Sequence, residues 1–384
     1  MKNGRIKVAL MSYAMDNRRG MGTALYTRRL IEKLIQDDRF EWYLVHFDTV
    51  DDPLYSQAHE ILIPRIPHLP FGTRFIRTML FFWKYRNEQF DIIHWFQPRL
   101  YPFFWLAPAR HIVVTAHGAG DITAPGQFPF SRRVYNFLMK HFNHRIDAVI
   151  GVSEFGKREI IEHYDVPSKK VFAIYNGGGE DFKDLDTAGS QRLVSQKYGV
   201  RAPFILDVSR LEPHKNIDTL IRAYEIMRRE SAISHRLVVV GAKRFGAEKT
   251  IALAKASPYA NDIMFLDFVQ QEHLNALYSA ADLFVFPSLN EGFGLPVIEA
   301  LASGTPVITS NVTALPEVAG GCALTVDPAD ANTLAEAMRR LLSDGELRRT
   351  LVEKGLVWAQ EFTWETTVRK TVALYESLTH ASSA

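Results

Sequence analysis

The sequence is poor in cysteine and has no long uncharged apolar stretch. Its single cysteine, Cys322, excludes an intrachain disulfide and a zinc site built from several thiolates, so a reducing compartment is expected. No apolar run approaches the roughly 20 residues that a helix needs to cross a bilayer. The apolar run at residues 6–11 is short and is soon followed by Asp16, Arg18 and Arg19, which is typical of a first strand rather than a signal peptide. We therefore expect a cytoplasmic protein without a membrane span.

The sequence also lacks the common metal and dinucleotide signatures. None of its 13 histidines stands in a His-Glu-x-x-His pattern. Asp184 and Asp186 form a carboxylate pair, but no strand precedes them, which favours a solvated charge run over a metal site. The glycine-rich segment 19–25 has Leu25 where a dinucleotide-binding fingerprint needs its third glycine. A backbone contact from Gly22 to a phosphate is therefore the better interpretation, and no metal or other cofactor is expected.

Length and composition indicate a globular protein of two domains. The chain has 384 residues, of which 47% are hydrophobic and 23% are charged, so it is too long for one ordinary core and too apolar for disorder. Residues 1–180 carry 24 Lys and Arg against 18 Asp and Glu, whereas residues 181–384 carry 21 against 25. The basic first part is compatible with an anionic partner.

Short β-rich runs alternate with longer amphipathic stretches along both halves of the chain. This alternation predicts an α/β protein with two doubly wound, Rossmann-like domains, in each of which helices cover a parallel sheet. The expected strands span residues 6–11, 41–47, 91–95, 111–116, 148–152, 171–175, 204–209, 237–241, 263–266, 283–287, 306–309 and 323–326. Consecutive glycines and an acidic run at 176–189 predict the linker between the domains. Ligands bind at the carboxyl ends of such strands, so two facing sheets would form a cleft for one ligand.

The segment 291–299, Glu-Gly-Phe-Gly-Leu-Pro-Val-Ile-Glu, is the most informative motif. Pro296 suits the first position of a helix and Gly304 suits its end. The loop before this helix would present backbone N–H groups to a phosphate. This loop consists of Gly292, Phe293, Gly294 and Leu295. Glu291 and Glu299 would accept hydroxyls of a sugar and a ribose, because carboxylates repel the phosphate itself. The alternative, to which we give less weight, is a structural helix start beside a solvated loop carboxylate.

Two basic residues follow the expected strand at 204–209. Arg210 and Lys215 belong to the segment Ser-Arg-Leu-Glu-Pro-His-Lys-Asn at the strand's carboxyl end. Cations at such a place can bind a diphosphate and stabilise the charge that develops as it leaves. The alternative is an ordinary basic turn before a helix that Asn216 caps.

A histidine ends another expected strand. His117 follows the strand at 111–116 directly and precedes Gly118, Ala119 and Gly120. A lone histidine is usually structural, but small neighbours at the carboxyl end of a strand leave space for a ligand. His117 is therefore a candidate catalytic residue.

With these elements in this order, the chain resembles the glycosyltransferase family 4 enzymes, a large group of retaining transferases with the GT-B fold. The pattern Glu-x-Phe-Gly-x-Pro-x-x-Glu, complete at 291–299, is the family's most specific motif, and the likeness extends through the second half from Asp207 to Gly320. Two positions depart from the family pattern. Arg19 stands where the first glycine of a pair is usual, and Gly118 stands where an acidic residue often follows the histidine.

The resemblance implies roles for the residues already singled out. Arg210 and Lys215 would bind the donor diphosphate, and Glu291, with the backbone of the loop that follows it, would hold the donor sugar and phosphate. Glu299 would bind the ribose, and His117 would line the sugar pocket as a catalytic residue. It also implies that a last helix packs on the first domain, which gives an acceptor-binding domain of residues 1–180 completed by 363–384, and a donor-binding domain of residues 181–362.

The activity that the resemblance predicts is hexosyl transfer from a nucleotide diphosphate sugar without a metal ion. His214-Lys215-Asn216 after Glu212-Pro213 looks more like the family's mannosyltransferases than its glucosyltransferases, which favours GDP-mannose as the donor. The expected setting is polysaccharide or lipopolysaccharide (O-antigen) biosynthesis. Two alternatives remain open: a nucleotide-sugar epimerase of the same fold, and a non-catalytic scaffold that binds sugar nucleotides.

The acceptor is expected to be a saccharide or a lipid-linked saccharide, not a nucleic acid. Residues 65–110 contain seven Lys and Arg, only Glu88 and Asp91 as acidic residues, and many aromatics, among them Trp83 and Trp105. This combination suits the headgroup region of an anionic bilayer, which predicts peripheral contact with the inner face of the plasma membrane. The alternative, weighed equally, is that the aromatics are core and the basic residues form a solvated helix face.

Overall fold

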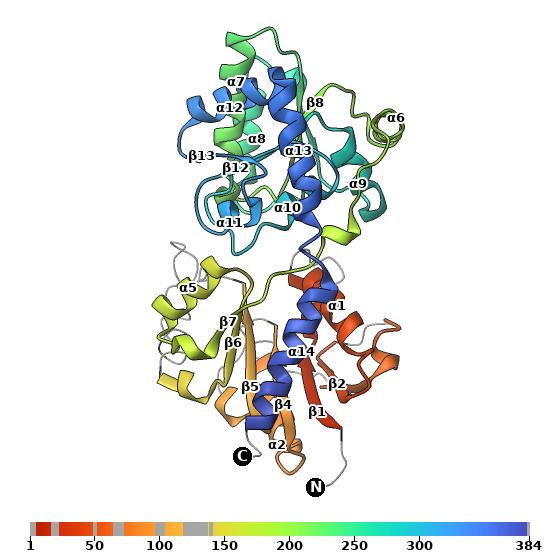
Figure 1. Cartoon of the computed structure of the whole chain (residues 1–384), viewed down its shortest axis with the longest axis vertical. Coiled ribbons are helices and arrows are strands. Elements are labelled where there is room, and N and C mark those ends of the chain that lie inside the picture. The colour runs from red at the N-terminus through yellow and green to blue at the C-terminus, as the bar shows by residue number, and fades with distance from the viewer. Residues whose placement is uncertain are drawn as a thin grey trace. The chain divides into compact units, whose positions relative to one another are not determined.

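The computed structural model describes residues 5–16, 23–48, 52–63, 73–96, 104–117, 137 and 141–381. The chain divides into two compact units, Met1–Asn176 with Trp364–Ala384, and Gly177–Thr363. Each unit contains its own parallel β-sheet (Figure 1). The predicted fold class, an α/β protein with two Rossmann-like domains, is confirmed.

The first unit has a seven-stranded sheet in the order β3-β2-β1-β4-β5-β6-β7. Its strands are β1 (Ile6–Met11), β2 (Phe40–His46), β3 (His59–Leu62), β4 (Phe90–Trp95), β5 (Ala109–Ala116), β6 (Ala148–Gly151) and β7 (Val171–Ala173). Its helices include α1 (Thr23–Leu34), α2 (Thr73–Lys84), α5 (Glu154–Tyr164) and α14 (Trp364–Ala381). The central strands, such as β4 and β6, are buried on both sides, as expected of a parallel sheet that helices cover on both faces.

Side chains that alternate along the strands pack into two separate apolar cores, one on each face of the sheet. In β1, Val8 and Leu10 pack with α1 and α14, whereas Ala9 and Met11 pack with α2 and α5. Figure 1 shows α14 running along the sheet of the first unit. Tyr375 of α14 is fully buried there, so this last helix is part of the core of the first unit.

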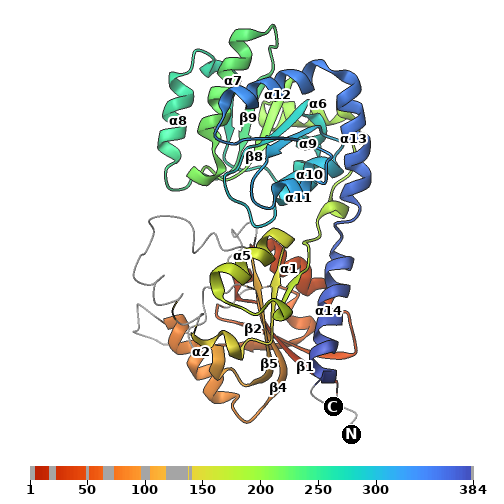
Figure 2. The same ribbon diagram turned by 60° about the vertical axis from the view of Figure 1, so that its left-hand side comes forward.

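The second unit has a six-stranded sheet in the order β10-β9-β8-β11-β12-β13. Its strands are β8 (Phe204–Val208), β9 (Arg236–Val240), β10 (Ile263–Leu266), β11 (Leu283–Phe286), β12 (Val307–Ser310) and β13 (Leu324–Val326). Its helices are α6 (Thr187–Tyr198), α7 (Ile217–Glu230), α8 (Ala247–Ala256), α9 (Gln271–Ala280), α10 (Leu295–Ala302), α11 (Leu315–Ala319), α12 (Ala331–Ser343) and α13 (Gly345–Ala359). One apolar core joins α7, α8 and α12 to the sheet, and Leu351 of α13 packs into the same core (Figure 2). The strand order reverses between β8 and β11, which makes this point the expected ligand crevice.

The linker differs in detail from the expectation. Residues 177–180 belong to the second unit rather than the first. The N–H of Gly179 donates to the carbonyl of Phe362 at 2.9 Å, and a Cβ at Gly179 would lie 2.1 Å from the carbonyl oxygen of Ala359. The end of the acidic run is helical, because Asp186 caps α6 by accepting from the N–H of Gly189 at 2.6 Å. The glycines therefore allow the linker to pack against the end of α13.

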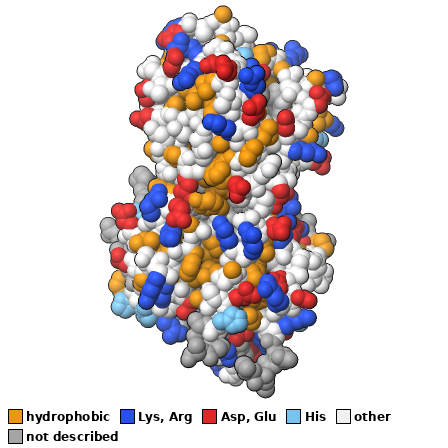
Figure 3. Space-filling view, viewed as in Figure 1, with side chains coloured by type: hydrophobic (Ala, Val, Ile, Leu, Met, Phe, Trp, Pro, Cys, Tyr) orange, Lys and Arg blue, Asp and Glu red, His pale blue; other side chains and the backbone are white. Residues whose placement is uncertain are grey.

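Charge is not segregated on the surface in view. Figure 3 shows acidic and basic side chains interspersed over the described part of this face, without an area of a single sign. Although the two halves of the chain differ in net charge, this side therefore shows no surface of a single charge sign.

Candidate functional site

Arg210 lies just beyond the carboxyl end of β8, on a segment that neighbouring backbone holds closely. A Cβ at Gly241, whose φ is +152°, would lie 2.1 Å from the carbonyl oxygen of Ser209. Only glycine, which has no Cβ, allows these two backbone segments to approach so closely. The N–H of Leu211 donates to the carbonyl of Ala242 at 3.1 Å. The backbone of Arg210 is thus fixed, while its side chain is 43% exposed and pairs with Glu212 at 3.3 Å.

Lys215 and Glu291 form an ion pair that joins two predicted site residues. Lys215 ends the short 3-10 helix Pro213–Lys215 after β8, and Glu291 lies in the loop after β11. Their side chains are only 12% and 15% exposed, and the ammonium group of Lys215 donates to a carboxylate oxygen of Glu291. The ammonium nitrogen also lies 5.3 Å from the ring centroid of Phe286. Charges of both signs therefore meet beside the switch point of the sheet.

The glycine-rich loop leads into α10 as the sequence predicts. Gly294 has φ +111°, and a Cβ there would lie 2.8 Å from a methyl carbon of Leu315. Pro296 lies in the first turn of the helix, and Phe293 is buried against the ring of Phe362 with centroids 5.8 Å apart. The loop Gly292 to Leu295 therefore stands at the N-terminus of α10, where backbone N–H groups and the helix dipole favour an anion.

Glu299 lies inside α10 and contacts Tyr278, a residue of α9 that no sequence motif indicates. Its carboxylate accepts a hydrogen bond from the Tyr278 hydroxyl at 2.7 Å. Burial raises the pKa of Glu299 to about 7, although the bond from Tyr278 partly lowers it. Burial likewise raises the pKa of Asp207, in β8, to about 7, against the lowering effects of a hydrogen bond from Ser209 and of the Lys215 charge. Two carboxyl groups near the switch point thus titrate close to neutral pH.

His117 belongs to the first unit and follows β5. Its Nε2 lies 3.1 Å from the carbonyl oxygen of Phe96, and its ring meets Tyr26 edge-on with centroids 4.8 Å apart. A carbonyl only accepts, so Nε2 carries the proton and Nδ1 is left as an acceptor. Burial lowers the pKa of His117 to about 4, while the Phe96 carbonyl acts in the opposite direction. The imidazole is therefore neutral at pH 7, and Phe96 orients it in place of a residue next to it in sequence.

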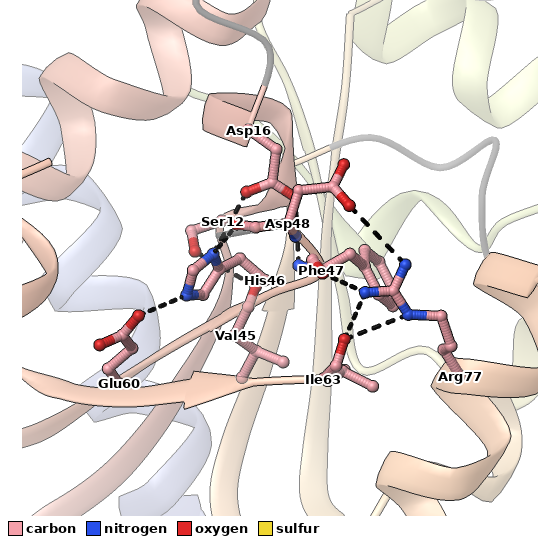
Figure 4. A network of polar contacts seen from close by, with 9 residues as sticks. All are labelled: Ser12, Asp16, Val45, His46, Phe47, Asp48, Glu60, Ile63 and Arg77. Carbon is pink, nitrogen blue, oxygen red and sulfur yellow. Dashed lines mark hydrogen bonds and ion pairs between the residues drawn. The ribbon is translucent and has the colours of Figure 1, made fainter. Parts of the chain in front are cut away.

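A polar network lies at the carboxyl edge of β1, β2 and β3 (Figure 4). The ring of His46 is fully buried, with Nδ1 3.3 Å from Asp16 and Nε2 2.9 Å from Glu60. Burial lowers the pKa of His46, but the hydrogen bonds and charges of Asp16 and Glu60 raise it overall. The buried guanidinium of Arg77 donates to the carbonyls of Phe47 and Ile63. This network cannot be predicted from the sequence, because its members are scattered along the chain and belong to no motif.

Three residues discussed from the sequence cannot be placed in the structure. Gly22, Arg19 and Gly118 lie outside the described residues. Among the described residues, no three His, Cys, Asp or Glu side chains gather as a metal ion would require. None of the helices in the described part of the chain has the length and apolarity to span a membrane.

The chain matches known protein families along most of its length. A family model described as "Glycosyltransferase Family 4" matches residues 21–177, and one described as "Glycosyl transferases group 1" matches residues 193–358. The O-antigen chain mannosyltransferase B of Escherichia coli is 31% identical over 332 residues, which are 85% of this chain and 81% of that protein. The serotype-specific mannosyltransferase WbdA of Escherichia coli is 33% identical over 259 residues, which are 66% of this chain but only 31% of that protein.

The fold is also found among solved structures. Sucrose-phosphate synthase from Thermosynechococcus elongatus superposes with a TM-score of 0.77 at 24% identity, and the match covers 98% of this chain and 100% of that chain. At this identity the likeness shows a shared fold.

Proposed function

This chain belongs to the glycosyltransferase family 4 enzymes, and we propose that its second unit binds a nucleotide diphosphate sugar whose hexose it transfers with retention of configuration. The observation that carries the proposal is the Lys215–Glu291 ion pair, held at the carboxyl edge of the sheet beside the loop that opens α10. Cation, carboxylate and helix N-terminus are the groups that a diphosphate bearing a sugar needs.

Each residue of the site has a proposed role. Arg210 and Lys215 bind the diphosphate and stabilise its charge as it leaves, and the Gly292 to Leu295 backbone binds phosphate oxygens. Glu291 accepts hydroxyls of the hexose, Glu299 accepts those of the ribose, and His117 contacts the sugar as a catalytic residue. Gly22 contacts a phosphate through its backbone.

In the proposed reaction, the acceptor hydroxyl approaches the face from which the diphosphate departs. The bond between the anomeric carbon and the diphosphate oxygen breaks first, through a short-lived oxocarbenium-like ion pair. The acceptor oxygen then bonds to the anomeric carbon, and a diphosphate oxygen takes its proton. Arg210 and Lys215 supply positive charge to the leaving group, so the mechanism requires no metal ion or other cofactor.

The proposed donor is GDP-mannose, and the proposed acceptor is a lipid-linked or other saccharide of O-antigen or polysaccharide biosynthesis. This proposal is supported by the two Escherichia coli relatives described above. Both are named as mannosyltransferases, and one is named for an O-antigen chain. The segment His214-Lys215-Asn216, which resembles that of the family's mannosyltransferases, supports the same donor.

A donor panel tests the proposal. GDP-mannose, UDP-glucose, UDP-galactose and UDP-N-acetylglucosamine are incubated with EDTA, with and without a lipid extract, and released nucleotide is measured. We expect release from GDP-mannose that rises with lipid and survives EDTA. Isomerisation of the sugar without release would favour an epimerase, and binding without turnover would favour a scaffold.

A variant pair ties the activity to the site. Arg210→Ala is expected to lower kcat/KM by about 100-fold, because removal of one group that stabilises transition-state charge costs this much. Arg229→Ala on α7 is the matched control, since that side chain is 67% exposed and pairs with its sequence neighbour Glu230. Full turnover by the Arg210 variant would contradict the proposed mechanism.

We also propose that α2 contacts an anionic membrane surface and thereby places the enzyme at the inner face of the plasma membrane, where a lipid-linked acceptor is held. Phe81, Phe82 and Phe104 are buried in the core, so they do not serve this purpose. Leu80 and Trp83 are 47% and 65% exposed.

Basic groups accompany these exposed apolar side chains. Lys84 is exposed beside Trp83, and the guanidinium carbon of Arg86 lies 4.6 Å from a Trp83 ring centroid. Apolar and basic side chains together suit an anionic interface. Flotation with phosphatidylglycerol vesicles is expected to recover the wild type but much less of Trp83→Glu. Phe245→Glu, at a 78% exposed position of the second unit, is the control and should float normally.

A further inference from the structure

Backbone strain is concentrated around the Lys215–Glu291 ion pair. Among the described residues, three non-glycine residues have φ in the left-handed region: Asp165 at 54°, Asn216 at 60° and Thr313 at 59°. Asn216 follows Lys215 directly, and Thr313 contacts the backbone of Glu291. Such strain persists only where surrounding contacts impose it, and it is typical of functional sites.

Asn216 links the turn that carries Lys215 to two other strands. Its amide nitrogen donates to the carbonyls of Pro287 at 3.0 Å and Pro328 at 2.7 Å, which follow β11 and β13. Its amide oxygen accepts from the Thr219 hydroxyl at 2.7 Å. Both amide hydrogens and the oxygen are therefore used, although the side chain does not cap α7. These bonds fix the backbone of Lys215 relative to β11, the strand that leads to Glu291.

Thr313 holds the other partner of the ion pair. Its hydroxyl oxygen accepts from the N–H of Glu291 at 3.3 Å and donates to the carbonyl of Val312 at 2.7 Å. The N–H of Ala314 donates to the carbonyl of Glu291 at 3.4 Å. A β-branched residue is costly in the left-handed region, yet here that conformation brings the hydroxyl and the next N–H to both backbone groups of Glu291.

We propose that Asn216 and Thr313 are positioning residues of the donor site, which hold Lys215 and Glu291 together before the donor binds. The proposal rests on the proposed function, since it assigns a purpose to the same ion pair. Neither side chain needs to touch the donor. Each acts by fixing the backbone of its charged partner, so that Lys215 meets the developing diphosphate charge without reorganisation.

Glycine substitutions test the proposal, because glycine tolerates the left-handed region but lacks the side-chain bonds. Asn216→Gly and Thr313→Gly are each expected to lower kcat by about tenfold, with donor KM changed less than about threefold, since Lys215 and Glu291 are still present to bind the donor but are no longer held in place as the diphosphate leaves. Thr313→Gly should unfold at or above the wild-type temperature, because the strain is relieved. Asn216→Asp, which accepts the same backbone conformation but has no amide hydrogens, should reproduce the kcat loss.

Asp165→Gly is the matched control. Asp165 is the third left-handed residue, ends α5 in the first unit, and is exposed. Because α5 begins at the carboxyl edge of the sheet, its end lies toward the opposite edge. The same substitution there should leave kcat and KM unchanged.

A double variant separates positioning from general damage. Asn216→Gly should cause no further loss of kcat when Lys215 is already alanine, because it acts through Lys215. Multiplying losses would overturn the proposal, as would full kcat in folded Asn216→Gly, Asn216→Asp and Thr313→Gly. A wild type that turns over no donor would instead refute the proposed function, which keeps the two failures distinct.

Discussion

The Tyr278 hydroxyl donates a 2.7 Å hydrogen bond to Glu299 inside the second unit, and both side chains are buried. The pKa of Glu299 is raised to about 7 by burial, and this bond is the interaction that opposes the rise. Tyr278 therefore governs how much of Glu299 is ionised at neutral pH. In the proposed function, the ionised form of Glu299 is the one that accepts a ribose hydroxyl.

Tyr278→Phe is expected to shift the pH dependence of donor binding. Below a pH of about 7, protonation of Glu299 should raise donor KM in the wild type, and loss of the hydrogen bond should move this inflexion upward by about one pH unit. KM measured from pH 6 to 9 checks the shift, and Glu299→Gln should remove the inflexion.

Tyr224→Phe is the control for this measurement. Tyr224 is a buried tyrosine on α7 whose hydroxyl donates to the carbonyl of His235 at 2.8 Å. Its loss should lower stability without moving the KM inflexion. An unchanged inflexion in Tyr278→Phe would mean that Tyr278 does not set the ionisation of Glu299.

The parts of the fold and site that the sequence predicts are those with a local signal. Strands that are buried on both faces appear in the sequence as short apolar runs. Segment 291–299 contains both the loop and the start of the helix within nine consecutive residues. Strand β3 was not predicted, because only Ile61 of its four residues is buried. The apolar residues of this edge strand are only Ile61 and Leu62, which is too short a run to indicate a strand.

The side-chain pairs of the site were not predictable, because tertiary packing creates them. Lys215 and Glu291 are 76 residues apart, and Tyr278 and Glu299 are 21 apart. Nothing in either segment indicates its partner. The Phe96 carbonyl that orients His117 belongs to the end of a neighbouring strand and is a backbone group, which every residue has. The sequence thus indicates candidate site residues, whereas the side-chain and backbone groups that they contact are known only from the structure.

His94 is expected to make the first unit sensitive to acid. It is fully buried, contacts the Tyr375 hydroxyl through Nδ1, and lies 2.8 Å from Thr115 through Nε2. Burial lowers the pKa of His94 to about 3. Because the unfolded histidine titrates near 6.5, its contribution to stability is complete above that pH and is lost as the pH falls toward 3. The raised pKa of His46 acts in the opposite direction within the same unit.

The change His94→Gln should reduce this acid sensitivity. Over the range from pH 6.5 to 4 the wild type is expected to lose about 1.4 kcal/mol per pH unit through this group, and the variant should not. At pH 7.5 the variant should be less stable, because the buried hydrogen bonds are disturbed. Urea unfolding at both ends of the range measures the difference, with the 62% exposed His59 replaced by Gln as control. Equal pH slopes in wild type and His94→Gln would contradict the assignment.

Gly241 is expected to tolerate no side chain, because the backbone that leads to Arg210 passes against it. An added Cβ would lie 2.1 Å from the Ser209 carbonyl oxygen, so Gly241→Ala must displace this segment or unfold it. We expect a loss of about 3 kcal/mol in unfolding free energy and a fall in donor turnover, since Arg210 moves with Ser209. Gly321→Ala is the control that separates this clash from backbone strain. Gly321 has φ +73°, but no atom lies within 4 Å of its Cβ position. We expect this variant to lose about 1 kcal/mol in unfolding free energy and no turnover. Equal stability and turnover of the two variants, measured by urea unfolding and the donor assay, would show that the close approach at Gly241 does not position Arg210.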